Sequence, residues 1–120
     1  MVEPNFIRVT PVLYAADVGA LARFFDWTLG FNVAFLTDTY AYVHRETAAL
    51  RVFKGAPEGT GRMAAYIDVE DVDGLWAEMK DALEALPEGS VIGPLDQPYG
   101  QREFHVRLPE GGTIGFGQTL

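Results

Sequence analysis

The segment REFHVRL (102–108) carries a carboxylate and an imidazole two residues apart. Side chains alternate along an extended strand, so Glu103 and His105 point to the same face. A histidine titrates near neutral pH, and with the nearby hydroxyl of Tyr99 this pair could perform acid–base chemistry without a metal. The second histidine, His44, lies on another predicted strand. Neither histidine has acidic or histidine partners at the regular spacing of a metal site.

Tyr99 is a large aromatic residue in a segment whose composition favours a turn. It lies between Pro98 and Gly100, just ahead of the strand that carries Glu103 and His105. Two interpretations remain open. The ring either folds back on its own domain as a lid over the core, or caps a pocket and stacks on whatever enters it.

Length and composition define a small globular protein. The chain has 120 residues, 48% of them hydrophobic and 22% charged, which is enough for one domain with a real core. The absence of cysteine excludes disulfides and thiolate metal sites. The first residues, MVEPNFIRVT, lack the apolar segment of a signal peptide, and no apolar run approaches the ~20 residues of a membrane span. We therefore expect a cytoplasmic protein with no membrane partner.

The net charge limits the possible partners. Seventeen acidic residues against nine basic ones give a formal charge of −8. Such a surface repels the phosphates of nucleic acid, so we expect no nucleic-acid partner. The charge is compatible with a cationic small molecule, and equally with a role in solubility alone.

Two stretches of the chain follow the same pattern. Residues 12–31 (VLYAADVGALARFFDWTLGF) and 65–83 (AYIDVEDVDGLWAEMKDAL) each contain a strand-like run, an Asp-Val pair and an amphipathic helical repeat. Asp17 and Asp71 occupy equivalent positions, and each is predicted to cap the N-terminus of its helix. The repeat therefore indicates a duplicated unit.

Three strand-like segments follow each predicted helix. They are residues 31–38, 39–47 and 48–55 in the first half, and 90–95, 102–108 and 112–118 in the second. A Gly- and Pro-rich linker at 54–62 separates the halves, and PEGG forms a turn between the last two strands. We predict an α+β fold: one domain over residues 1–120, made of two βαβββ modules at about 1–55 and 62–120 that share a core.

Three blocks of this sequence resemble the vicinal oxygen chelate superfamily, which includes glyoxalases, extradiol dioxygenases and bleomycin resistance proteins. They are TPVLYAADVGALARFFDWTLGF, MAAYIDVEDVDGLWAEM and QPYGQREFHVRLPEGG, and the similarity is greatest to the bleomycin-resistance branch. The resemblance implies paired βαβββ modules whose curled sheets enclose a cavity. It also implies a homodimer with clefts at the subunit interface, in which the N-terminal strand crosses to the partner. Pro11 is consistent with that exchange and equally with a simple edge strand.

The resemblance also implies where enzymes of this superfamily hold a divalent metal. Their histidine ligands would fall on Thr10 and Ala64, and their final glutamate on Gly115, with a counterpart near 49–51. Threonine, alanine and glycine lack the donors of a stable metal site. We therefore expect no metal and no other cofactor, and the enzymatic chemistry that depends on a metal is expected to be lost.

Matching to the resistance proteins places aromatic residues where those proteins sandwich a planar drug: Phe35, Tyr40 and Tyr99. Acidic side chains that would attract a cation correspond to Asp38 and Asp68. Tyr66 shares a strand face with Asp68, and Arg102 adds positive charge near the cleft. For Phe35 core packing remains an alternative, and for Asp68 a solvated strand end.

The predicted function is the binding and sequestration of a planar or cationic, antibiotic-type small molecule by a homodimer. Departures from the resistance proteins, such as Ala34 and Thr37 in place of acidic residues, favour a ligand other than bleomycin itself. The alternative is a lyase or isomerase of the same superfamily, using Glu103, His105 or Tyr99. A third hypothesis is a regulatory or structural dimer whose cavity has no remaining function.

Overall fold

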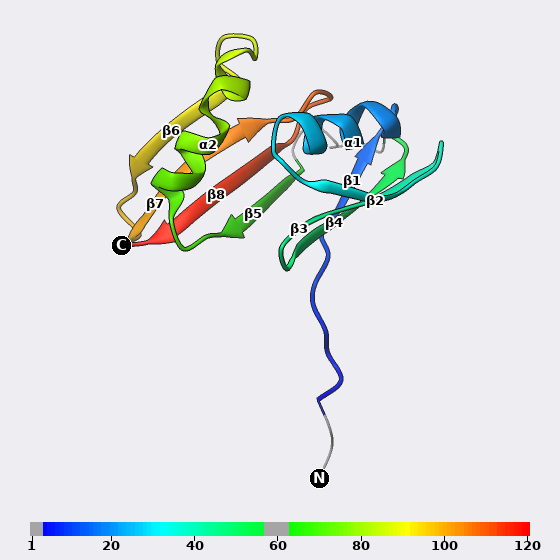
Figure 1. The fold of residues 1–120 in the computed structure, drawn as a ribbon, viewed down its shortest axis with the longest axis horizontal. Coiled ribbons are helices and arrows are strands. Elements are labelled where there is room, and N and C mark those ends of the chain that lie inside the picture. Colours follow the sequence, from blue (N-terminus) through cyan, green and yellow to red (C-terminus); the bar gives the residue numbers. More distant parts are fainter. Residues whose placement is uncertain (1–3, 57–62) are drawn as a thin grey trace.

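The computed structural model describes residues 4–56 and 63–120, and it confirms the α+β fold of two βαβββ modules (Figure 1). The first module consists of β1 (Val12–Ala15), α1 (Val18–Trp27), β2 (Asn32–Leu36), β3 (Tyr40–Arg45) and β4 (Ala48–Lys54). The second consists of β5 (Ala64–Asp68), α2 (Val72–Glu84), β6 (Val91–Asp96), β7 (Gln101–Arg107) and β8 (Thr113–Thr119). Positions 57–62 of the predicted linker lie outside the described residues.

The two modules have the same sheet topology. The strand order is β1-β4-β3-β2 in the first sheet, called sheet A here, and β5-β8-β7-β6 in the second, sheet B. In each sheet the first strand pairs in parallel with the last, and the remaining neighbours are antiparallel. Equivalent topology in both halves is what the sequence repeat predicts.

Both helices begin at the predicted aspartates. The Asp17 carboxylate accepts a hydrogen bond from Ala20 N at 2.9 Å, and that of Asp71 accepts one from Gly74 N at 2.9 Å. Each cap satisfies a backbone N–H that has no partner within the helix. A Cβ at position 74 would lie 2.3 Å from Asp71 Oδ2, so a larger residue there would make the capping carboxylate shift.

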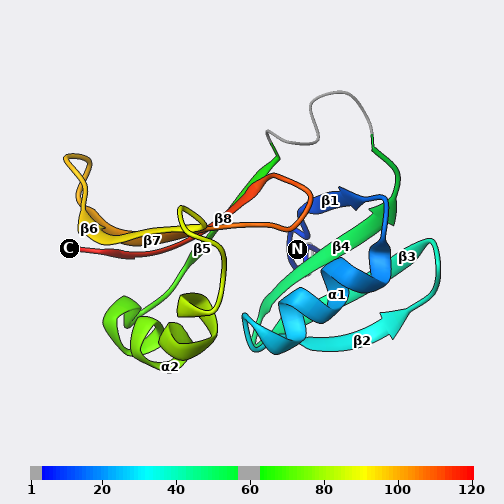
Figure 2. The same cartoon turned by 90° about the horizontal axis from the view of Figure 1, so that it is seen from above.

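One face of each sheet packs against its helix and the other stays open (Figure 2). Leu13, Val43 and Val52 point from sheet A toward α1, while Phe104 and Phe116 point from sheet B toward α2. These residues belong to one contiguous buried cluster with members from both modules. The open faces are therefore the surfaces on which side chains remain available for binding.

The N-terminal arm, residues 4–10, extends away from the two sheets without forming a strand (Figure 1). Its apolar side chains Phe6, Ile7 and Val9 are almost fully exposed. In the described part of the chain, no helix combines the length and apolarity needed to cross a membrane.

Candidate binding site on the open sheet faces

Glu103 is the centre of a polar cluster on the open face of sheet B. Its side chain is only 2% exposed, and three donors from different elements surround its carboxylate. Tyr99, in the turn between β6 and β7, donates its hydroxyl proton to Oε1 at 2.7 Å, and the Tyr66 hydroxyl of β5 lies 3.1 Å from the same oxygen. The ring of His105 contacts Oε2 through Nε2. The predicted shared face of Glu103 and His105 is thus confirmed as a direct contact.

Two glycines of β8 make room for this cluster. A Cβ at Gly117 would lie 1.6 Å from the Tyr66 hydroxyl, and one at Gly115 would lie 2.9 Å from both Tyr66 Cδ2 and His105 Cε1. The Tyr66 ring therefore lies directly on the backbone of β8. Side chains at these two positions would push Tyr66 away from the Glu103 carboxylate.

The cluster favours an ionised Glu103 and neutral tyrosines. Burial alone would raise the pKa of Glu103, but the hydrogen bonds from Tyr99, His105 and Tyr66 together lower that pKa below its usual value. Burial and the hydrogen bond to Glu103 raise the pKa of Tyr66 to about 12. The hydrogen bond to Glu103, followed by burial, raises the pKa of Tyr99. At neutral pH the site therefore holds a fixed negative charge beneath two phenol rings.

Sheet A presents a row of aromatic rings on its open face. The ring centroids of Phe35 and Tyr40 are 5.9 Å apart, and those of Tyr40 and Phe53 are 5.1 Å apart. Arg51 donates to the Tyr40 hydroxyl at 2.6 Å, and its guanidinium lies 5.0 Å from the centre of the Tyr42 ring. Such rings can stack on a flat ligand.

The structure groups the predicted aromatic residues by sheet. Phe35 and Tyr40 lie together on sheet A, and Tyr66 and Tyr99 lie together on sheet B. Phe35 is 54% exposed and Tyr99 is 66% exposed, so neither ring is folded into the hydrophobic core. The Tyr99 hydroxyl turns back to Glu103 of its own sheet while the ring stays largely exposed, so both interpretations of Tyr99 remain open.

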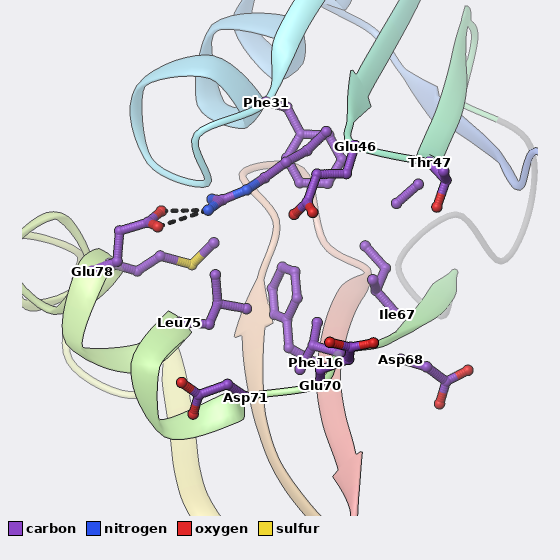
Figure 3. Close-up of a pocket in the computed structure, with 14 residues that line it drawn as sticks. Phe31, Glu46, Thr47, Ile67, Asp68, Glu70, Asp71, Leu75, Glu78 and Phe116 are labelled. Atoms are coloured by element: carbon purple, nitrogen blue, oxygen red, sulfur yellow. Dashed lines mark hydrogen bonds and ion pairs between the residues drawn. The ribbon is translucent and has the colours of Figure 1, made fainter.

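The two predicted acidic residues line different hollows of the surface, and, in addition to burial, the charge of Asp68 contributes to the raised pKa of Tyr66. Asp38, in the β2–β3 turn, lines a separate hollow of about 600 Å³ together with Lys54. Asp68, the last residue of β5, lines a cleft of about 530 Å³ between the two modules. In that cleft (Figure 3), side chains such as Leu75 and Phe116 form an apolar floor, and acidic side chains form the rim.

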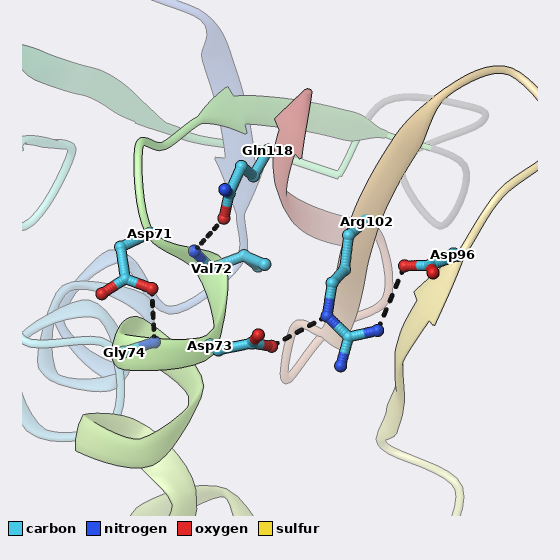
Figure 4. Close-up of polar contacts among 7 residues, drawn as sticks. All are labelled: Asp71, Val72, Asp73, Gly74, Asp96, Arg102 and Gln118. Carbon is cyan, nitrogen blue, oxygen red and sulfur yellow. Dashed lines mark hydrogen bonds and ion pairs between the residues drawn. The ribbon is translucent and has the colours of Figure 1, made fainter. Parts of the chain in front are cut away.

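Arg102 lies on the opposite face of β7 from Glu103. Its guanidinium donates to Asp73 Oδ1 at 2.8 Å and to Asp96 Oδ1 at 3.1 Å (Figure 4). These contacts join β7 to the first turn of α2 and to β6, so the structure does not bring Arg102 to the aromatic cluster. Gln118 lies on the same helix-facing side and accepts a hydrogen bond from Val72 N at 2.9 Å.

Sequence reasoning missed residues of the open face of sheet A, among them Phe53 and Arg51. Phe53 contributes a ring to the aromatic row and lies 6.4 Å from Tyr14 between ring centroids, and Arg51 donates a hydrogen bond to Tyr40. Alternation along ALRVFK, which places positions 49, 51 and 53 on one face, was the signal that could have identified Arg51 and Phe53.

The positions that the resemblance assigns to a metal do not fit one. Thr10, Ala64 and Gly115 offer at most one hydroxyl oxygen, and a longer side chain at position 115 would collide with Tyr66 and His105. Within residues 4–56 and 63–120, no group of three His, Cys, Asp or Glu side chains is arranged to hold a metal ion. These three positions therefore do not supply the ligands that metal-dependent chemistry requires.

Comparison with solved structures identifies the family. The chain is 33% identical to the bleomycin-binding protein of bleomycin-producing Streptomyces verticillus, solved with copper(II)-bleomycin, with 97% of each chain covered and a TM-score of 0.82. The chain belongs to the vicinal oxygen chelate superfamily. Within that superfamily it belongs to the bleomycin-resistance branch.

More distant structures share the fold. The bleomycin resistance determinant of transposon Tn5 is 20% identical, with a TM-score of 0.79 over 93% of this chain and 97% of its own. A lactoylglutathione lyase from Agrobacterium tumefaciens is 19% identical, with a TM-score of 0.72 over 97% of this chain and 96% of its own. The sequence matches no protein-family model and no curated protein sequence.

Proposed function

We propose that this protein binds and sequesters a bleomycin-type small molecule, with a planar aromatic part and positive charge, and does not convert it chemically. The observation that carries the proposal is the exposure of aromatic rings on both open sheet faces, in a chain 33% identical to a bleomycin-binding protein over nearly its whole length. Rings in these positions would stack on the planar part of the ligand. The ionised Glu103 and the net charge of −8 favour a cation.

The proposal includes a homodimer. The stacking rings of one chain lie on two different sheets, so a second copy could place sheet A of one chain opposite sheet B of the other. The exposed apolar side chains of the N-terminal arm support an exchange with the partner, because isolated apolar residues gain free energy when they are buried. Sedimentation equilibrium tests this point: a mass of twice 13.2 kDa supports the dimer, and a mass of 13.2 kDa refutes it.

Titration calorimetry with metal-free and copper-loaded bleomycin tests the binding. We expect the wild type to bind bleomycin, because the 33% identity to a bleomycin-binding protein over 97% of the chain outweighs the local differences at Ala34 and Thr37. The Phe35→Ala and Tyr99→Ala changes should each weaken affinity by roughly fivefold or more, since a lost aromatic pair costs ~1 kcal/mol beyond buried area. Trp27→Ala is the matched control, because this ring is 74% exposed on α1, away from the open faces. Equal losses in all three variants would contradict the proposed location. Mass spectrometry of released bleomycin should show an unchanged molecule.

The contact between Glu103 and His105 favours a second candidate, an acid–base lyase or isomerase. That function requires turnover that is lost in His105→Ala. A panel of glyoxalase-type substrates that the wild type leaves unchanged would count against it.

A further inference from the structure

We infer that Glu103 is a positioning residue of this binding site: its buried carboxylate fixes the Tyr99 ring in the orientation that stacks on a ligand. The inference rests on the proposed function, since it assigns Tyr99 a role in binding. It goes further by naming the group that orders the stacking ring before the ligand arrives.

Tyr99 needs an external tether because its turn does little to hold the ring. Backbone hydrogen bonds from Gln97 N to Gln101 O (2.7 Å) and from Gly100 N to Gln97 O (3.1 Å) shape the turn, but they leave the side chain free. Among the described residues, no aromatic ring pairs with Tyr99, and its ring is 66% exposed. The hydroxyl contact with Glu103 at 2.7 Å is therefore what fixes the direction of the ring.

Glu103 can act as a tether because its own position is fixed from several sides. On β7 it pairs with Gly117 of β8 and with Leu95 of β6, so its backbone lies in the middle of sheet B. Tyr66 and His105 hold the carboxylate from two further directions. A buried charge with several donors is held strongly, because the loss of any donor leaves part of that charge unsolvated.

Ordering the ring in advance would raise affinity. A tyrosine that is free to rotate loses side-chain entropy when a ligand immobilises it, and this loss weakens binding. The Glu103 contact has already restricted the ring in the unbound protein. Removal of the contact should therefore weaken binding even when the aromatic ring itself is retained.

A double-mutant cycle with bleomycin as the probe tests the inference. Tyr99→Phe keeps the ring and removes the hydroxyl, and Glu103→Leu removes both oxygens that can accept its hydrogen bond. We expect each single change to weaken affinity about three- to tenfold, and the double variant to bind no worse than the weaker single variant. Losses that multiply in the double variant would overturn the inference. Glu84→Leu, which replaces an exposed carboxylate on α2 whose Oε1 lies 3.9 Å from Lys80 Nζ, is the matched control and should bind like the wild type.

A ligand-free measurement separates failure of this inference from failure of the proposed function. In protein with ¹³C-labelled tyrosine rings, relaxation should show Tyr99 as rigid as Tyr66 in the wild type, and mobile on the picosecond–nanosecond timescale in Glu103→Leu. If the wild type does not bind bleomycin but Tyr99 is ordered by Glu103, the proposed ligand is wrong and the tether stands. If the mobility of Tyr99 is the same in both proteins, the tether is refuted whatever the ligand. If Glu103→Leu does not fold, the Tyr99→Phe variant with ¹³C-labelled phenylalanine rings provides the same comparison, because the ring at position 99 then has no hydroxyl to hold it.

Discussion

Gly117→Ala is the sharpest test of the geometry beneath the site. A Cβ at this position would lie 1.6 Å from the Tyr66 hydroxyl and 2.4 Å from Tyr66 Cζ, so the two cannot coexist. Gly117 does not have a positive φ, and alanine therefore introduces no backbone strain. The whole penalty must come from moving Tyr66. Because Tyr66 is already 42% exposed, its ring can swing into solvent without disturbing the core.

The size of the effect follows from what Tyr66 loses. Its hydrogen bond to the buried Glu103 carboxylate is of the charged type, which contributes roughly 1.5–3 kcal/mol. Replacing glycine in an ordinary conformation returns about 0.5 kcal/mol by restricting the unfolded chain. We expect Gly117→Ala to lower the free energy of unfolding by about 1.5 kcal/mol. In a Tyr66→Ala background the same change should be neutral, or stabilising by about 0.5 kcal/mol.

Urea unfolding followed by tryptophan fluorescence measures all four members of this cycle, at one protein concentration and at pH 7. The predicted coupling between positions 66 and 117 is about 2 kcal/mol. If Gly117→Ala has the same cost in both backgrounds, Tyr66 does not lie on the backbone of β8 and the described cluster is wrong. Gly117→Ala should also weaken bleomycin binding in the wild-type background and leave it unchanged in the Tyr66→Ala background, because only in the former does the change displace a ring from Glu103.

Four further predictions concern the cap, the contact between modules and, in two cases, the response to pH. Asp71→Ala should lower the free energy of unfolding by about 1 kcal/mol in urea titrations through loss of the α2 cap, and asparagine should restore most of it. Arg45 joins the modules, because it donates to Leu29 O at 3.0 Å and pairs with Glu78 at 2.7 Å. Arg45→Ala should lower the free energy of unfolding by about 1 kcal/mol in the same assay. An unchanged free energy would mean that this contact does not stabilise the fold. Folding lowers the pKa of Glu103, so the ionised carboxylate stabilises the fold fully above its unfolded pKa of 4.5, and this stabilisation is lost as the pH falls below that value. A plot of the urea unfolding midpoint against pH should therefore fall on the acid side of that pH, and it should fall less steeply for Glu103→Gln. The pKa of Tyr66 is raised from 10.0 to about 12, so its contribution is present below pH 10 and is lost between pH 10 and 12, a loss that Tyr66→Phe should reduce.

Local patterns predicted the fold well because they depend on short-range physics. An aspartate before an amphipathic run caps a helix wherever that run occurs, and both predicted caps are present. The repeat of the pattern around Asp17 and Asp71 predicted two equivalent modules, and the two sheets have equivalent strand orders. The turn at Tyr99 was readable from Pro98 and Gly100 for the same reason.

Local patterns predicted the site less completely. Alternation placed Glu103 and His105 on one face of β7, but the prediction that Arg102 lies near the cleft was wrong, because Arg102 is on the opposite, helix-facing side of the strand. The docking of α2 decided this outcome, since it placed Asp73 beside Arg102. The acidic residues predicted to attract a cation, Asp38 and Asp68, line two separate hollows, and, in addition to burial, the charge of Asp68 contributes to the raised pKa of Tyr66.

Residues close together in the chain were enough to specify the elements, their order, the helix caps and the aromatic character of the site. The contact of Glu103 with Tyr66 came instead from long-range packing, because that hydrogen bond joins the Glu103 carboxylate to a strand 37 positions away. Strand register sets that contact, through the parallel pairing of β5 with β8 and the antiparallel pairing of β7 with β8. Register depends on the packing of the whole sheet, so no local pattern contained the position of Tyr66 over Gly117.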